Sequence, residues 1–401
     1  MLKEQISMTK ISRLKNNTIY FDNSATSFPK PPAVVDAVVD YMTLVGANPG
    51  RSGHRMACEA GKIVFQARKN IAEFFGVKSP MNVIFSSNAT DSLNLAIKGI
   101  LCQDDHVITS SMEHNSIIRP LKMLEDRGII SITVLPGDDS GIISTGELDS
   151  AKKNNTKAVI INHMSNVTGI VQPVAEIGKW CKKNNMIFIL DCAQSAGIIP
   201  IDLKSDSIDM IAFAGHKGLY GPTGTGGLII SDSFDVRKMN PLKEGGTGSM
   251  SDKTVQPNFL PDMYESGTLN VAGIAGLSKG VEFLNNMPEK LKSVQLHKVT
   301  LQKYFIEKAS KRIDGFKSYS ASSGFGVVSF TIGGLSVSEI TQRLSDDFDI
   351  MSRQGLHCSP LAHQRIGTFP EGTVRFSFSV FNTIYEVETA LEALKIIRDG
   401  K

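Results

Sequence analysis

Two residues able to carry chemistry follow two successive apolar segments of the chain. Lys217 comes shortly after the run 210–214, and Asp191 directly follows the run 186–190. A lysine at the end of a buried strand is costly unless it has a chemical partner, because desolvation disfavours the ammonium. The same burial makes the amine a nucleophile that can form a Schiff base.

The strand pattern predicts that Lys217 and Asp191 face one pocket. In open α/β sheets, ligands bind beyond the carboxyl ends of the strands. Pyridoxal 5'-phosphate needs these two groups, because an acid pairs with its ring nitrogen and an amine binds its aldehyde carbon. The glycines between Gly218 and Gly227 would let the backbone approach such a ligand closely. A lysine beside glycine would otherwise be an ordinary surface residue in a turn.

With these residues, the chain resembles the class V aminotransferase family of fold-type I pyridoxal-phosphate enzymes. Within that family it is similar to the group that contains cysteine desulfurases and selenocysteine lyase, from about residue 18 to 395. The resemblance implies an α/β fold, in which a mainly parallel sheet lies between helices and a smaller α+β domain is attached. We expect residues 31–270 to form the large cofactor-binding domain, and residues 1–30 and 271–401 to form the small one.

The resemblance also implies the other cofactor contacts. Ala89 and Thr90 lie in a turn before a predicted helix, where free backbone N–H groups could bind the phosphate, although ordinary helix capping is the alternative. In the family, the histidine matching His114 stacks on the pyridine ring and assists proton transfer. Further contacts are implied to the phenolic oxygen from Asn166 and Gln194, to the phosphate from His216, and to the partner subunit's phosphate from Thr268.

The sequence departs from the family pattern at two phosphate-binding positions. Asn88-Ala89 stands where relatives usually have Gly-Thr, and Ala214 replaces a common serine. Both changes remove a hydroxyl group. We therefore expect weaker binding of the cofactor phosphate, with the Schiff base at Lys217 retained.

Cys358 lies in a segment that contains glycine and proline and shows no helical or strand periodicity. Arg353 and His357 are near it in sequence and would favour its thiolate form. The order Arg-x-Gly-x-His-Cys-x-Pro-Leu resembles the cysteine loop of group II desulfurases. Further along, Arg375 offers a planar fork that suits a carboxylate. The family places this arginine on the substrate's α-carboxylate. A buried structural cysteine and a solvated edge arginine are the alternatives.

The resemblance implies the conversion of L-cysteine to L-alanine, with Cys358 taking the sulfur as a persulfide. We expect Arg375, Asn166 and Arg353 to contact the substrate, and a small acceptor protein to receive the sulfur. Selenocysteine lyase, acting on L-selenocysteine, and cysteine or cystine lyase remain alternatives on the same scaffold. A degenerate cofactor-binding regulator is the non-enzyme alternative. Whether the sulfur serves iron–sulfur cluster assembly stays open.

Composition and charge exclude several other classes of protein. The 401 residues allow two domains, and a net charge of +3 argues against a nucleic-acid or membrane surface. The polar, basic start does not have the pattern of a signal peptide, and no apolar run approaches the roughly 18 residues that span a bilayer. The five cysteines are scattered without CxxC pairs, which predicts a cytoplasmic protein with no metal site. We expect Cys58 and Cys192 to be packed.

Overall fold

The computed structural model describes residues 18–50 and 53–400, and a seven-stranded sheet lies at its centre. The strand order is β2-β8-β7-β6-β5-β3-β4, and only β8 runs against its neighbours. The mainly parallel sheet predicted from the sequence is therefore confirmed. The strands are β2 (Val83–Ser86), β3 (Asp105–Ser110), β4 (Ile130–Leu135), β5 (Thr156–Asn162), β6 (Ile187–Asp191), β7 (Met210–Ala214) and β8 (Gly226–Ile230).

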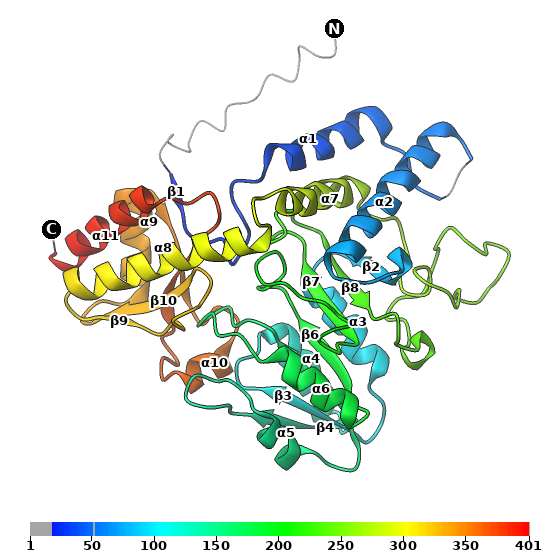
Figure 1. The fold of residues 1–401 in the computed structure, drawn as a ribbon, viewed down its shortest axis with the longest axis horizontal. Coiled ribbons are helices and arrows are strands. Elements are labelled where there is room, and N and C mark those ends of the chain that lie inside the picture. Colours follow the sequence, from blue (N-terminus) through cyan, green and yellow to red (C-terminus); the bar gives the residue numbers. More distant parts are fainter. Residues whose placement is uncertain (1–17, 51–52, 401) are drawn as a thin grey trace, which may run out of the picture.

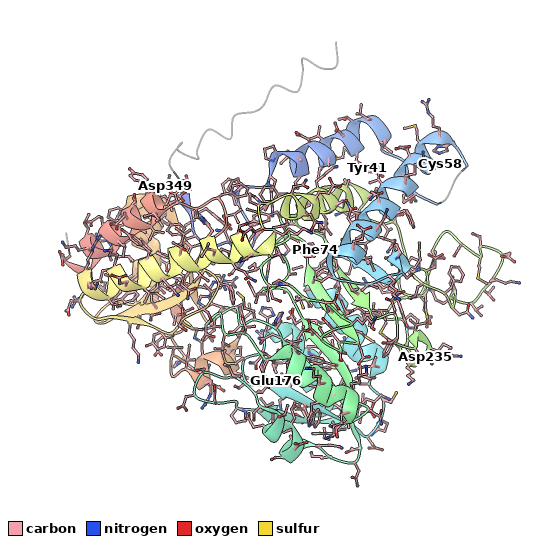
Figure 2. The ribbon with its side chains drawn as sticks, in the orientation of Figure 1. Tyr41, Cys58, Phe74, Glu176, Asp235 and Asp349 are labelled. Carbon is pink, nitrogen blue, oxygen red and sulfur yellow. The ribbon has the colours of Figure 1, made fainter. Side chains whose placement is uncertain are left out.

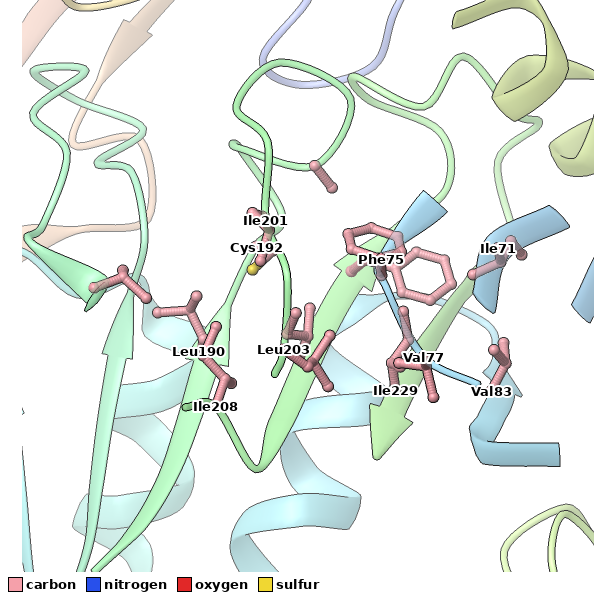
Figure 3. Packing of buried hydrophobic residues seen from close by; sticks show 14 of the residues in the cluster. Ile71, Phe75, Val77, Val83, Leu190, Cys192, Ile201, Leu203, Ile208 and Ile229 are labelled. Atoms are coloured by element: carbon pink, nitrogen blue, oxygen red, sulfur yellow. The ribbon is translucent and has the colours of Figure 1, made fainter. Parts of the chain in front are cut away.

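Helices cover both faces of this sheet (Figure 1). Along β5, Val159 and Ile161 belong to one buried cluster, whereas Ala158 and Ile160 belong to another on the opposite face. Figure 3 shows part of the first cluster, around Phe75. A strand buried on both faces reads as a continuous apolar run, which explains the sequence pattern. The helices are α1 (Pro32–Asp40), α2 (Arg55–Phe74), α3 (Ala89–Ile100), α4 (Asn115–Asp126), α5 (Thr145–Ala151), α6 (Val174–Lys183) and α7 (Val271–Asn285).

A second, smaller sheet has the order β12-β13-β10-β9 and packs against its own helices. Its buried cluster is rich in phenylalanine, including Phe305, Phe330 and Phe376. Near it, β1 (Ile19–Tyr20) pairs in parallel with β11 (Ile350–Met351), so the start of the described chain joins this part. The remaining elements are α8 (Leu291–Arg312), β9 (Phe316–Ser318), β10 (Val327–Ile332), α9 (Val337–Phe348), β12 (Arg353–Gly355), α10 (Pro360–Arg365), β13 (Thr373–Ser377) and α11 (Ile384–Arg398).

The packing changes from one core to the other inside α8, which runs from the large part to the small part (Figure 1). Helix α7 packs against α1 and α2, and Val294 of α8 still belongs to the large cluster. Leu301 and Phe305 belong to the small one. We therefore propose that the domain boundary lies within α8, later than the predicted residue 271. Residues 1–17 of the predicted small domain lie outside the described part.

All five cysteines are free thiols. Cys192 is fully buried, as expected. The expectation that Cys58 is packed is wrong, because its side chain is exposed near the start of α2 (Figure 2). In the described part of the chain, no helix has both the length and the apolar character needed to cross a membrane.

Candidate active site

A cavity of about 490 Å³ lies beyond the carboxyl ends of the parallel strands. Asp191 is the last residue of β6, Lys217 follows β7, and His114 follows β3. Eight of the residues predicted for the site line this cavity: Ala89, Thr90, His114, Asn166, Asp191, Gln194, His216 and Lys217.

Burial shifts the ionisation of both central groups toward their neutral forms. Desolvation lowers the pKa of Lys217 to about 8, although the charge of Asp191 opposes the shift. Desolvation likewise raises the pKa of Asp191, against a hydrogen bond from the N–H of Ala193 (2.8 Å) and the charge of Lys217. A neutral lysine amine is a nucleophile, and a buried carboxylate favours a cationic partner.

His114 is held at the N-terminus of α4. Its Nδ1 accepts the backbone N–H of Ser116 (3.1 Å) and lies 2.8 Å from the Ser116 hydroxyl, which in turn lies 2.8 Å from Thr90 Oγ1. Desolvation, together with the charge of Lys217, lowers the pKa of His114 to about 4. The ring is therefore neutral, with its proton on Nε2. Ser116 was not predicted, and only its position two residues after His114 hints at this contact.

The turn before α3 suits an anion such as a phosphate. Asn88 caps the helix by accepting the N–H of Asp91 (2.9 Å), and the following residues border the cavity. A Cβ on Gly226 would lie 2.7 Å from Asn88 Cα. Because this distance is too short for two carbon atoms, position 226 must be glycine for the turn to pack against β8. Nearby, the buried Nδ1 of His216 has no hydrogen-bond partner among the described residues.

These groups fit pyridoxal 5'-phosphate. Asp191 offers a buried carboxylate for the ring nitrogen, and Lys217 offers an amine for the aldehyde carbon. The N-terminus of α3 and the unpartnered Nδ1 of His216 are available to the phosphate. Ala214 presents only a methyl group to the cavity, in keeping with the lost hydroxyl noted in the sequence.

Arg375 is 1% exposed on β13, an inner strand of the small sheet, so it is not a solvated edge residue. Its Nη2 donates to Asp22 Oδ1 (2.9 Å) and its Nη1 to the carbonyl of Asn166 (3.1 Å). Its Nε has no partner among the described residues. A guanidinium has five N–H donors, so these two contacts leave donors unused, although Arg375 is not among the residues that line the cavity. Asp22 was missed because its partner lies 353 positions away.

Cys358 is exposed, and Arg353 Nη2 lies 3.6 Å from its sulfur. His357 does not act as a second cation, contrary to the sequence-based expectation. Its ring is 3% exposed and its Nε2 lies 3.1 Å from Thr373 Oγ1. Burial, with a contribution from the charge of Arg375, holds the pKa of His357 well below its ordinary value. Arg353 is thus the cation in contact with the thiol.

Thr268 lies apart from these residues. It lines a different cavity, of about 890 Å³, together with Ser87 and Asp91. Its hydroxyl accepts a hydrogen bond from Asn48 (3.4 Å). Within one chain, Thr268 is therefore not among the residues that line the cavity of Lys217.

We expect acidification to destabilise the fold between pH 6.5 and about 4. Five histidines have pKa values lowered to about 4, chiefly by burial: His106, His114, His163, His216 and His363. In the unfolded chain they would bind protons near the ordinary value of 6.5. Below that pH the unfolded state binds more protons, so the free energy of unfolding falls. Thermal melting across this range measures the effect.

A variant of one buried histidine tests the origin of this pH dependence. His106 lies between Thr133 and Thr156 and outside the cavity, so His106→Asn should reduce the slope of melting temperature against pH. An unchanged slope in His106→Asn would contradict the assignment of a neutral, buried His106.

Comparison of the chain with known proteins identifies a family that it matches. Residues 19–390 match the family model described as aminotransferase class-V. The chain is 30% identical over 391 residues to a probable cysteine desulfurase of Methanothermobacter thermautotrophicus, covering 96% of each chain. It is 32% identical over 395 residues to a probable cysteine desulfurase of Pyrococcus abyssi, covering 95% of this chain and 94% of the relative. The apo structure of a cysteine desulfurase from Thermococcus onnurineus superposes with a TM-score of 0.88 at 32% identity, covering 96% and 95%.

Proposed function

The chain belongs to the class V aminotransferase family, and on this premise we propose that it is a pyridoxal-phosphate-dependent cysteine desulfurase. The observation that carries the proposal is the position of the exposed thiol. The loop of Cys358 is hydrogen-bonded to Asn166, which lines the cavity, and to Asn115, which adjoins His114. Product analysis with L-cysteine tests the proposal, because a desulfurase yields alanine whereas a lyase yields pyruvate.

The chain's own residues would bind the cofactor and the substrate. When bound, pyridoxal 5'-phosphate supplies an electron sink for the charge left at Cα after its proton is removed. Asp191 would keep the ring nitrogen protonated, and the amine of Lys217 would take the Cα proton. Arg375 would hold the α-carboxylate through its free donors. The neutral His114 would lie against the ring.

Cys358 would accept the sulfur. Its thiolate attacks the sulfur of the substrate, an S–S bond forms, and the Cβ–S bond breaks with its electron pair left on the carbon skeleton. Protonation of that skeleton gives alanine, and the sulfur stays on Cys358 as a persulfide. Arg353, 3.6 Å from the thiol, would stabilise the negative charge on sulfur. We further propose that a small protein takes up this sulfur, and that the reaction occurs in the cytoplasm, where thiols stay reduced.

Replacing Arg375 with lysine should raise the KM for L-cysteine by roughly 10- to 100-fold. Lysine keeps the charge but loses the planar fork that grips a carboxylate at two points. Steady-state kinetics of alanine formation measure the change. As a control, Arg365→Lys alters an arginine that donates to the carbonyl of Asp138, away from the cavity, and should leave KM near its wild-type value. An unchanged KM in Arg375→Lys would remove Arg375 from the carboxylate site.

We propose a homodimer in which a second copy covers the exposed apolar face of the N-terminal helices. This face is defined by Val35, Val39, Met42, Leu44, Met56 and Phe65. Exposed apolar side chains on neighbouring helices mark candidate surfaces for contact with another protein. In such a dimer, Thr268 would reach the phosphate site of the partner subunit, which it does not reach within its own chain.

The dimer proposal predicts the effect of a charge on this face. Met42→Glu combined with Leu44→Glu should halve the molar mass in solution and weaken retention of the cofactor. Light scattering after size-exclusion chromatography measures the mass. Leu296→Glu is the matched control, since Leu296 is a similarly exposed leucine on α8. A double variant with the same mass as the wild type would place the interface elsewhere.

A further inference from the structure

The backbone at the candidate nucleophile adopts a conformation that side chains seldom take. His357 has φ 48° and Cys358 has φ 60°, so two successive residues other than glycine lie in the left-handed region. Such residues persist only where their surroundings hold them. The position of the Cys358 thiol therefore depends on contacts made by this loop.

Asn166 makes those contacts on both sides of Cys358. Its Nδ2 donates to the carbonyl of His357 (2.6 Å), and its Oδ1 accepts the hydroxyl of Ser359 (2.7 Å). Asn166 is 4% exposed and Ser359 is fully buried, so both hydrogen bonds are shielded from water. A third bond joins the carbonyl of Cys358 to the N–H of Asn115 (2.8 Å).

The Ser359 hydroxyl has no role in its own helix. Ser359 occupies the N-cap of α10, where a serine side chain ordinarily accepts a backbone N–H of the first turn. Here it makes no such bond and donates to Asn166 instead. A capping role therefore does not account for this hydroxyl, whereas a role in holding the loop does.

Asn166 connects this loop to the rest of the site. The side chain lines the cavity of Lys217, and the backbone carbonyl accepts from Arg375 Nη1 (3.1 Å). An amide nitrogen carries two hydrogens, and His357 takes one of them, which leaves the other for a ligand in the cavity. Asn166 therefore borders the cavity, contacts Arg375, and is hydrogen-bonded to the residues on both sides of Cys358.

We propose that Asn166 and Ser359 are positioning residues that hold Cys358 in the orientation from which its thiol attacks the substrate's sulfur. This inference rests on the proposed desulfurase function. It adds a role for Ser359, and a second role for Asn166 besides its expected contact with the cofactor. A displacement of a reacting group by about 1 Å can lower the rate on the order of 100-fold. Breaking the hydrogen bonds of Asn166 to His357 and Ser359 should therefore slow sulfur transfer without weakening substrate binding.

The test compares Ser359→Ala with Ser352→Ala. Ser352 lies on the same segment, and its buried hydroxyl has no partner among the described residues, so its removal breaks no hydrogen bond. For the holoenzyme, Ser359→Ala should lower kcat for alanine formation roughly tenfold with KM for L-cysteine unchanged. Ser352→Ala should match the wild type in both constants.

A second readout does not depend on turnover. Alkylation of Cys358 by iodoacetamide, followed by peptide mass spectrometry, should become several-fold faster in Ser359→Ala because the loop is less restrained. The exposed thiols of Cys58 and Cys102 serve as internal references whose rates should stay constant. If Ser359→Ala folds poorly, Asn166→Asp removes the donor to His357 while keeping an acceptor for Ser359, and the same alkylation change is expected.

Equal behaviour of Ser359→Ala and Ser352→Ala in kcat and in alkylation would overturn the positioning role. The two readouts also separate this inference from the proposed function. If the wild type formed no alanine, the desulfurase assignment would fail. The alkylation rates alone would still decide whether Asn166 and Ser359 hold Cys358 in position.

Discussion

Replacing Lys217 with alanine should lower kcat for alanine formation by roughly 10²- to 10⁴-fold, the range that a positioned acid–base group supplies. The side chain of Lys217 lines the cavity. Burial lowers the pKa of Lys217 to about 8, so a substantial part of the amine is neutral near that pH and can accept a proton. Alanine has no group that could hold the aldehyde carbon of the cofactor or move the Cα proton. Alanine production by purified protein, with added cofactor, measures the loss.

A second lysine provides the control for this prediction. Burial also lowers the pKa of Lys30 to about 8, but its amine donates to Ser27 Oγ (2.8 Å) and to the carbonyl of His216 (2.9 Å). Lys30→Gln keeps a donor for those contacts and should retain most of the activity. Comparable losses in Lys217→Ala and Lys30→Gln would mean that a general change in the site, and not the amine of Lys217, limits the reaction.

Cys358→Ala should reduce alanine formation from L-cysteine by roughly 100-fold or more, because the nucleophile that accepts the sulfur is removed. The KM should change little, since the proposed carboxylate contact lies on Arg375. The variant should also lose the persulfide that mass spectrometry detects on the wild-type peptide. Cys58→Ser and Cys102→Ser, which alter the other two exposed thiols, should behave as the wild type. Full activity in Cys358→Ala would contradict a persulfide mechanism.

The sequence pattern was sufficient to predict the sheet and one wall of the cavity. Parallel strands bring their carboxyl ends to one edge, so a residue that closes an apolar run has a predictable place. Asp191 ends β6 and Lys217 follows β7, and both line the cavity. The same reasoning places His114 beyond the end of β3.

Contacts between distant segments could not be predicted in this way. The pairing of Arg375 with Asp22, and of Ser359 with Asn166, depends on how the small sheet docks on the large one. Local sequence carries no signal for such a pair. The left-handed backbone at Cys358 also has no marker, because neither glycine nor asparagine occupies the position.

The expectations for Cys58 and His357 differed from the structure because burial depends on tertiary packing. The sequence places His357 beside the thiol as a potential cation, but its ring is buried and uncharged. Helix α7 follows the loop of Thr268, and its apolar pattern does not specify which core it joins. From its packing against α1 and α2, we propose that it belongs to the large one.

The most direct test of the desulfurase assignment is product analysis of the wild type and Cys358→Ala, side by side, with L-cysteine and a reductant. We predict that the wild type releases alanine and sulfide in equal amounts without pyruvate, and that Cys358→Ala forms neither alanine nor sulfide at a comparable rate. Pyruvate in place of alanine, with Cys358→Ala still active, would contradict the account and make the protein a lyase.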